Sequence, residues 1–175
     1  MKKIMMTLAA AIIAVSASAQ VYVGGGVGIG TSKVKVGGLS ESATAYKFVP
    51  EVGYNFNDKL AAGVAFGWQG VTKGGEKSVE VSPYVRYTFF KSQYINAFVD
   101  GGVGYGHVYN DGNDYDKLNV GLRPGVAVNL NEKLSFVTHV GFFGYEHEKE
   151  GEAKINSWGA NLDGTNIVFG LYYNF

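Results

Sequence analysis

The chain contains no cysteine among its 175 residues, only three prolines and few charged side chains. Without cysteine there are no disulfides, no thiolate metal sites and no lipid-modified N-terminal cysteine. Charged residues make up 17% of the chain, below the roughly 25% that is usual in soluble domains. The formal net charge is zero, so the sequence lacks the basic surface that binds nucleic acid, and we expect no nucleic-acid partner.

Long apolar runs are also missing after residue 19, since none approaches the ~18 residues of a transmembrane helix. The first 19 residues resemble an export signal. Its features are a positive start (Lys2, Lys3), a short apolar run (Ile4 to Val15) and small residues at a cleavage site (Ala17, Ala19). We therefore predict a signal peptide over 1–19, cleaved before Gln20, and a single domain over 20–175. A short N-terminal anchor is the alternative.

Alternation of period two dominates the rest of the sequence, and this period predicts strands with two different faces. Eight segments show it: 21–34, 43–56, 60–71, 78–90, 94–108, 117–130, 134–146 and 164–175. The connections after the second, fourth and sixth segments are short, whereas the others are longer and polar, the last running from His147 to Asp163. These features predict an all-β fold, an eight-stranded antiparallel up-and-down transmembrane β-barrel.

The three prolines occupy equivalent places in three of these segments. Pro50, Pro83 and Pro124 each open a similar stretch that runs into a short turn. Proline cannot donate a hydrogen bond to a strand ladder and usually avoids paired strands. The prolines therefore suggest bulges, an interpretation that the sequence alone leaves open.

The two faces of the predicted strands differ in bulk and charge. One face carries large apolar residues, and the other carries glycines, small residues and every mid-strand charge. Eight strands enclose room for little more than packed side chains, and a lipid-facing Arg or Lys near the bilayer midplane costs about 2–4 kcal/mol. We therefore assign the bulky face to lipid and the charges to the lumen. They are Glu51, Glu80, Arg86, Asp100 and Arg123.

These five charges have both signs, and paired charges are tolerated in a narrow lumen where unpaired ones are costly. We predict an ion-pair and hydrogen-bond network that closes the lumen, with a conduction path as the alternative. His139 also falls on the lumen face. On the lipid face, aromatic residues cluster at the strand ends, as interfacial belts do. One predicted belt is Tyr54, Phe56, Tyr87, Phe89, Tyr94, Phe136, Tyr173 and Phe175, and the other is Tyr46, Phe48, Phe66, Trp68, Tyr105 and Phe142.

The C-terminal segment alternates apolar residues and ends in phenylalanine, with Phe169, Leu171, Tyr173 and Phe175 on one face. With this C-terminal segment and the eight alternating segments, the chain resembles the small outer-membrane β-barrels of Gram-negative bacteria, which are porin-like, OmpX/OmpA-type eight-stranded barrels. The resemblance implies that these four residues are an assembly signal for the barrel-assembly machinery. It also implies a place in the outer membrane, with the lipid bilayer and lipopolysaccharide as partners.

Three further segments carry residues that could act in catalysis, in metal binding or in contact with a partner. His107 falls on the lipid face, where lipid A deacylases of this barrel size carry a histidine, a serine and an acid, but no serine is clearly placed beside it. The segment Asn110–Asp116 is rich in oxygen ligands yet lacks the EF-hand pattern, so a solvated turn is favoured over a calcium site. The loop from His147 to Asp163 is acidic and carries Trp158; it is interpreted as a hydrophilic cap or as a contact for a partner.

We therefore predict no catalytic residues, no cofactor and no metal site. The predicted function is that of a non-enzymatic integral outer-membrane barrel that contributes to envelope structure. Its surface loops would be available for adhesion or for binding a host or surface ligand. Two alternatives remain open: a narrow porin for small solutes, and a lipid A-modifying enzyme.

Overall fold

The computed structural model describes residues 20–36, 39–72, 77–110, 114–150, 153–161 and 168–175. The predicted signal peptide, with Ala17 and Ala19, lies outside the described residues. Ten strands are formed: β1 (Val21–Val36), β2 (Leu39–Asn55), β3 (Leu60–Val71), β4 (Lys77–Lys91), β5 (Ile95–Tyr109), β6 (Tyr115–Asn129), β7 (Leu134–His139), β8 (Phe142–Glu150), β9 (Ala153–Asn161) and β10 (Val168–Asn174). No helix long and apolar enough to cross a membrane occurs in the described part of the chain.

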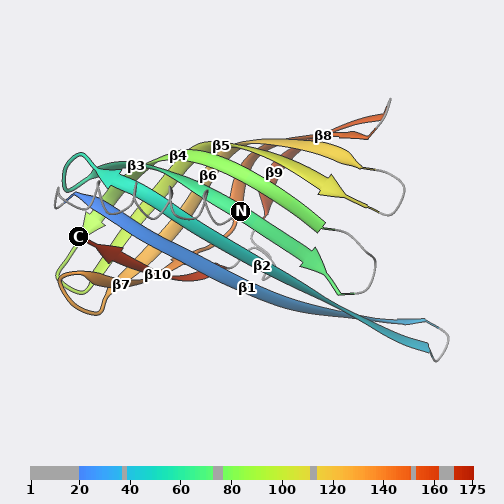
Figure 1. The fold of residues 1–175 in the computed structure, drawn as a ribbon, viewed down its shortest axis with the longest axis horizontal. Coiled ribbons are helices and arrows are strands. Elements are labelled where there is room, and N and C mark those ends of the chain that lie inside the picture. The colour runs from blue at the N-terminus through green and yellow to red at the C-terminus, as the bar shows by residue number, and fades with distance from the viewer. Residues whose placement is uncertain (1–19, 37–38, 73–76, 111–113, 151–152, 162–167) are drawn as a thin grey trace, which may run out of the picture.

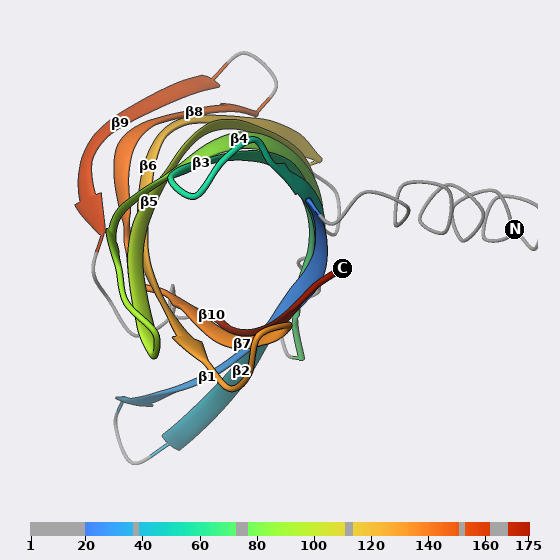
Figure 2. The same ribbon diagram turned by 90° about the vertical axis from the view of Figure 1, so that its left-hand side faces the viewer.

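Eight of the strands form a closed ring. The order β5-β4-β3-β2-β1-β10-β7-β6 is completed by pairing of β6 with β5, and every pair is antiparallel. Figure 2 shows the ring nearly end-on. Closure leaves these strands with partners on both sides, which a sheet in hydrocarbon requires. The predicted eight-stranded antiparallel barrel is confirmed.

Three short turns and the C-terminus lie at one end of the barrel, called the turn end below; the opposite end is the hairpin end (Figure 1). Two of the turns use the same device. Asn57 Oδ1 accepts hydrogen bonds from the backbone N–H groups of Lys59 and Leu60, both at 2.9 Å. Asn131 Oδ1 does the same for Lys133 and Leu134, at 2.9 and 2.8 Å. Asparagine favours such turns because its side chain replaces a backbone acceptor.

The seventh predicted strand, 134–146, is interrupted. β6 pairs with β7 up to Gly125↔His139 and with β8 from Leu122↔Phe143, so this strand contains one extra residue at Val140–Gly141. Gly141 has a φ of 77°, which an L side chain rarely adopts. A slip of one residue turns each following side chain to the other face of the strand. The extra residue is a β-bulge that reverses the two faces between β7 and β8.

The reversal overturns one sequence prediction. Phe142 lies on the lumen side rather than in an aromatic belt, because its ring packs beside Gly121 and Gly144 and lines the inner cavity. Phe143 and Tyr145 are exposed on the outer face instead. The predicted loop from His147 to Asp163 is also partly wrong, since much of it forms an antiparallel β8–β9 hairpin that flares away from the ring (Figure 2).

The three prolines keep the register of their ladders. Pro50 is paired with β1, Pro83 with β3 and Pro124 with β5. Only Pro124 lies opposite a bulge, the one at Val140–Gly141, where the Val140 N–H donates to the Pro124 carbonyl at 2.9 Å. A separate register shift between Thr88 and Phe90 of β4 contains no proline. The bulge interpretation therefore holds for one proline of three.

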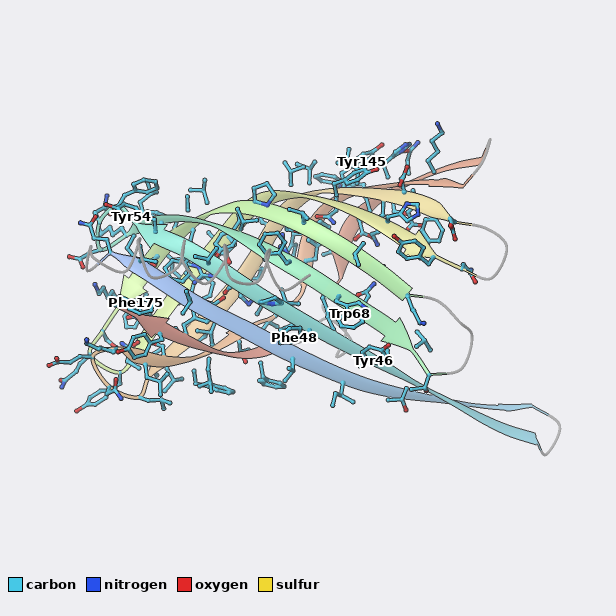
Figure 3. All side chains as sticks on the ribbon, viewed as in Figure 1. Tyr46, Phe48, Tyr54, Trp68, Tyr145 and Phe175 are labelled. Atoms are coloured by element: carbon cyan, nitrogen blue, oxygen red, sulfur yellow. The ribbon has the colours of Figure 1, made fainter. Side chains whose placement is uncertain are left out.

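The outer surface of the ring is apolar. Large side chains such as Ile29, Phe66 and Trp68 are 79%, 46% and 56% exposed. Labelled aromatic side chains lie towards both ends: Tyr54 and Phe175 at the turn end, and Tyr46, Trp68 and Tyr145 towards the hairpin end (Figure 3). The buried residues face the lumen and include both rings and charges. The apolar outside and the charged inside are the reverse of the arrangement in a soluble protein, and the outer surface suits contact with lipid acyl chains.

Candidate functional site

The centre of the lumen holds a buried ion pair. Arg86 of β4 and Asp100 of β5 are directly opposite each other in the ladder. The Arg86 guanidinium donates two hydrogen bonds to the Asp100 carboxylate, from Nε to Oδ1 at 2.7 Å and from Nη2 to Oδ2 at 2.8 Å. The side chains are only 10% and 4% exposed. Such two-pronged geometry is the strongest arrangement open to this pair.

Asp100 has a third partner in His139 of β7. The Nε2 atom of His139 lies 2.9 Å from Asp100 Oδ2. An ionised carboxylate only accepts hydrogen bonds, so the histidine proton must sit on Nε2. The structure thus brings together three residues that the sequence placed separately on the lumen face, from β4, β5 and β7.

Four aromatic rings surround the Arg86 guanidinium. Its carbon lies 4.0 to 5.6 Å from the ring centroids of Phe98, Tyr172, Tyr84 and Tyr22. The rings of Tyr22 and Tyr172 stack with centroids 5.7 Å apart, and the hydroxyls of Tyr22 and Tyr84 are hydrogen-bonded at 2.6 Å. We call Arg86, Asp100 and these four rings the middle layer. Cation–π contacts of this kind are most favourable when water is excluded.

Each ring of the middle layer lies over a glycine of the neighbouring strand. The cross-strand pairs are Tyr22↔Gly53, Tyr172↔Gly24, Tyr84↔Gly63 and Phe98↔Gly125. A Cβ at any of these glycines would overlap ring atoms of its partner. The glycines of the lumen face therefore provide the space that the rings occupy.

These rings are the functional residues that sequence reasoning missed. The lumen was expected to hold small residues and charges, but large rings fill its middle. Period-two alternation had already placed Tyr84 on the face of Arg86, and Tyr172 on the inward face of the last strand. What the pattern could not provide was the cross-strand register that sets each ring over a glycine.

Two cavities lie on either side of the middle layer. The turn-end chamber, about 750 Å³, has Tyr22, Arg86, Phe98 and Tyr172 in its wall. Its polar lining is mostly uncharged, with Gln20, Asn55, Thr88, Asn96, Asn129, Ser135 and Asn174, but it also includes the charged residues Asp58, Lys91 and Glu132. The hairpin-end chamber, about 200 Å³, has Tyr84, Asp100 and His139 in its wall. Its other polar lining is mostly charged: Lys47, Glu51, Glu80, Lys117, Arg123 and Glu146. The middle layer thus separates a chamber whose polar lining is mostly uncharged from one whose polar lining is mostly charged.

The other three predicted lumen charges all face the hairpin-end chamber but are not joined in one chain of ion pairs. Glu80 accepts hydrogen bonds from the Ser82 hydroxyl and from Asn119 Nδ2, the latter at 3.3 Å. One carboxylate oxygen of Glu51 and the Nη2 atom of Arg123 have no hydrogen-bond partner in the described structure. The predicted network is therefore concentrated on Arg86 and Asp100.

The C-terminal strand completes the ring. β10 pairs with β1 on one side and β7 on the other. Phe169, Leu171 and Tyr173 are 49%, 53% and 39% exposed on the lipid face, and the Phe175 N–H donates to the Val21 carbonyl at 3.0 Å. The four residues of the predicted assembly signal thus lie beside the start of the described chain.

His107 lies near the hairpin end with an acidic neighbour. Its Nδ1 atom is 2.7 Å from Asp116 Oδ1, and its Nε2 atom is 3.9 Å from Asp114. These aspartates are the residues of the described structure that hydrogen-bond or ion-pair with His107, and neither supplies a nucleophile for acyl transfer. Among described residues, no three His, Asp or Glu side chains gather as a metal site. Residues 111–113 of the oxygen-rich segment lie outside the described residues.

The acidic segment after residue 145 is held to the barrel wall. Lys117 Nζ lies 3.3 Å from a carboxylate oxygen of Glu146 and 3.3 Å from one of Glu148. Across the β8–β9 hairpin, Tyr145 donates to Asn156 Oδ1 at 2.7 Å. Trp158 of β9 is 84% exposed. The hairpin therefore presents a large aromatic side chain on a fixed two-stranded support.

Comparison with known proteins agrees with this geometry. The chain resembles two solved structures over most of its length. One is the Neisserial surface protein A, with 16% identity and a TM-score of 0.59, over 90% of this chain and 98% of that one. The other is the outer membrane protein OprG from Pseudomonas aeruginosa, with 15% identity and a TM-score of 0.56, over 89% and 96%. These likenesses show a common fold, and no curated protein matches the chain.

A family model decides the classification. The model described as "Outer membrane protein beta-barrel domain" matches residues 5–175, nearly the whole chain. The closed ring, the apolar outer surface and the polar lumen are the features that a barrel in a bilayer requires. The protein is therefore a bacterial outer-membrane barrel, and the chain belongs to the outer membrane protein β-barrel domain family.

Proposed function

We propose that the protein is a closed, non-enzymatic barrel that contributes to envelope structure and presents binding surface at its hairpin end. The observation that carries this proposal is the middle layer. Its ion pair and four rings occupy the centre of the lumen and separate the two chambers. In barrels of this class the short turns face the periplasm, so the hairpin end faces outwards. There it would meet lipopolysaccharide and surface ligands.

A conductance measurement in planar bilayers tests whether the lumen is closed. We expect the wild-type barrel to be silent and the Arg86→Ala/Asp100→Ala variant to conduct. Removing both partners avoids leaving one buried ion unpaired, so this variant is expected to fold. Gel migration before and after heating reports whether each sample is a folded barrel. Large, stable channels in the wild type would contradict the proposal and favour the narrow porin.

The β8–β9 hairpin is the surface best suited to contact a partner. Aromatic side chains supply much of the binding energy in protein interfaces, and Trp158 is 84% exposed on this hairpin. We expect Trp158→Ala to weaken adhesion of bacteria to host cells or to a coated surface. A matched change on another outward aromatic, Phe89→Ala at the turn end, should leave adhesion unchanged. Equal adhesion of the two variants would contradict a role for the hairpin.

The enzyme alternative depends on His107. Its partner Asp116 could orient the ring as a base, but the described structure gives it no nucleophile. We expect mass spectrometry of lipid A to show the same species with the wild type and with His107→Ala. A product made only by the wild type would establish the lipid A-modifying enzyme instead.

The remaining partners follow from insertion into the membrane. We propose that Phe169, Leu171, Tyr173 and Phe175 are recognised by the barrel-assembly machinery before the ring closes. A signal peptide over 1–19, cut after Ala19, would bring the chain to the periplasm. N-terminal sequencing of the outer-membrane form, expected to start at Gln20, tests the second step. Loss of folded barrel after Phe175→Ala tests the first.

A further inference from the structure

The hairpin-end chamber contains two ions whose binding capacity is unused. Glu51 is only 8% exposed, yet its Oε1 atom has no hydrogen-bond partner in the described structure. Arg123 lines the same chamber, and its Nη2 atom is likewise buried and unpartnered. Buried charged groups without partners are strongly disfavoured. A ligand that formed hydrogen bonds with these two atoms would therefore gain the most binding free energy in this chamber.

The other ions of the chamber, apart from Lys47, have hydrogen-bond or ion-pair partners. Asp100 is held by Arg86 and His139, Glu80 by Ser82 and Asn119, and Lys117 by Glu146 and Glu148. Lys47 lines the chamber too and adds positive charge to it. The unpartnered buried atoms are thus one carboxylate oxygen of Glu51 and one guanidinium nitrogen of Arg123, on groups of opposite sign.

The two ions that carry these unpartnered atoms approach the chamber from opposite walls. Glu51 belongs to β2 and Arg123 to β6, and these strands are four places apart in the ring of eight. A molecule with a single charge would satisfy only one of them. A molecule with a positive and a negative end satisfies both at once.

The size of the chamber restricts the ligand further. Its volume is about 200 Å³, which corresponds to roughly seven water molecules at about 30 Å³ each. An ammonium and a carboxylate joined by one or a few carbon atoms fit within that space. Below the chamber the middle layer blocks the lumen, so such a molecule would bind there rather than pass through.

We propose that the hairpin-end chamber is a binding site for a small zwitterion. Its ammonium group lies against the Glu51 carboxylate and its carboxylate against the Arg123 guanidinium. The middle layer forms the floor, and Tyr84 lines the same space. The site is separate from the exposed surface of the β8–β9 hairpin, so it stands independently of adhesion.

Titration of the refolded, isotope-labelled barrel in detergent micelles tests the site. Glycine and β-alanine are the probes, and acetate and methylammonium are the single-charge controls. We expect saturable NMR shifts confined to residues around the chamber for both probes. Glu51→Gln and Arg123→Gln should each weaken binding at least about tenfold, since each removes a charged hydrogen bond. Glu132→Gln, in an exposed turn, is the matched control and should bind like the wild type.

A second measurement keeps the result independent of ligand choice. Without ligand, a buried carboxylate with an unpartnered oxygen is destabilising, so Glu51→Gln should raise the urea midpoint of unfolding. A lower midpoint would mean that Glu51 is internally paired and would overturn the proposal. Three other results would also overturn the proposal of a zwitterion site. They are equal binding of the probes and the single-charge controls, NMR shifts at the turn-end chamber, and no saturable shifts at all, which would leave water as the only occupant.

Discussion

Two ion pairs of the described structure have similar chemistry but very different surroundings. Arg86–Asp100 joins β4 and β5 in the middle layer, with side chains 10% and 4% exposed. Lys91–Asp58 joins the last residue of β4 to the turn between β2 and β3, with side chains 51% and 86% exposed. Water can replace either partner of the second pair, whereas the first pair is buried and its guanidinium is surrounded by four aromatic rings.

The contrast teaches what each region contributes. In the middle layer, charges, rings and glycines depend on one another. Changing a charge or a ring leaves a buried group without its partner, and enlarging a glycine makes its side chain overlap a ring. At the turn end each contact is local and solvated, so a change affects little beyond itself. The four predictions below test this difference, beginning in the middle layer.

The largest effect is expected from Asp100→Asn. The substitution removes the charge that balances the buried Arg86 guanidinium and replaces one of the two carboxylate oxygens, both of which accept hydrogen bonds, with an amide NH2 group that cannot accept. Breaking one side of a buried pair typically costs about 3–5 kcal/mol. Urea unfolding of the barrel in lipid vesicles measures the loss. Asp58→Asn makes the same chemical change in the exposed pair, and a comparable loss in both variants would contradict the contrast.

A second large effect is expected from Gly63→Ala. The new Cβ would lie 2.7 Å from the Tyr84 hydroxyl and from its ring, and 2.9 Å from the Val52 carbonyl oxygen. Relieving such overpacking costs about 1–3 kcal/mol. Gly159→Ala is the matched control, because nothing lies within 4 Å of its added Cβ and surface changes usually stay within about 0.5 kcal/mol. Equal unfolding midpoints for the two alanine variants would show that the Tyr84 ring can move aside without loss of stability.

This glycine shows how far the sequence could predict the molecule. Alternation assigned Gly63, Arg86 and Asp100 to the lumen face, because the period of a strand depends only on neighbouring residues. That Tyr84 covers Gly63 depends on register between strands, and the sequence does not state register. The site was therefore predicted as a network of inward charges, while its rings and the particular ion-pair partners were not predicted.

The bulge at Val140–Gly141 marks the second limit. One extra residue reversed the faces of the following strand, so Phe142 turned inward against the prediction. Period-two reasoning assumes an unbroken strand, and a glycine within a strand is compatible with either continuity or a bulge. The β8–β9 hairpin was missed because charged, polar residues dominate it and no buried face imposes alternation.

At the turn end, Asn131→Ala should have a moderate effect. It removes the side-chain acceptor of the Lys133 and Leu134 N–H groups. Because both are exposed to water, we expect a loss of about 1 kcal/mol, read from the urea midpoint. Glu132→Ala, in the same turn, should lie within about 0.5 kcal/mol of the wild type. A loss as large as that of Asp100→Asn would mean that the turns, not the middle layer, control stability.

The smallest effect concerns the exposed pair itself. A hydrogen bond and the positive charge of Lys91 hold the pKa of the Asp58 carboxyl below its usual range. A lowered pKa in the folded state stabilises the barrel above the unfolded pKa of about 3.9, and the contribution is lost as the pH falls through the folded pKa. The wild type should therefore slightly exceed Asp58→Asn in urea midpoint at pH 7. The difference should disappear in acid, and also at pH 7 in about 1 M salt, where the Debye length is near 3 Å. If the difference in urea midpoint between the wild type and Asp58→Asn became larger as the pH fell, the pKa of Asp58 would be raised in the folded state and not lowered. If the difference persisted in about 1 M salt, the ion pair would be shielded from water.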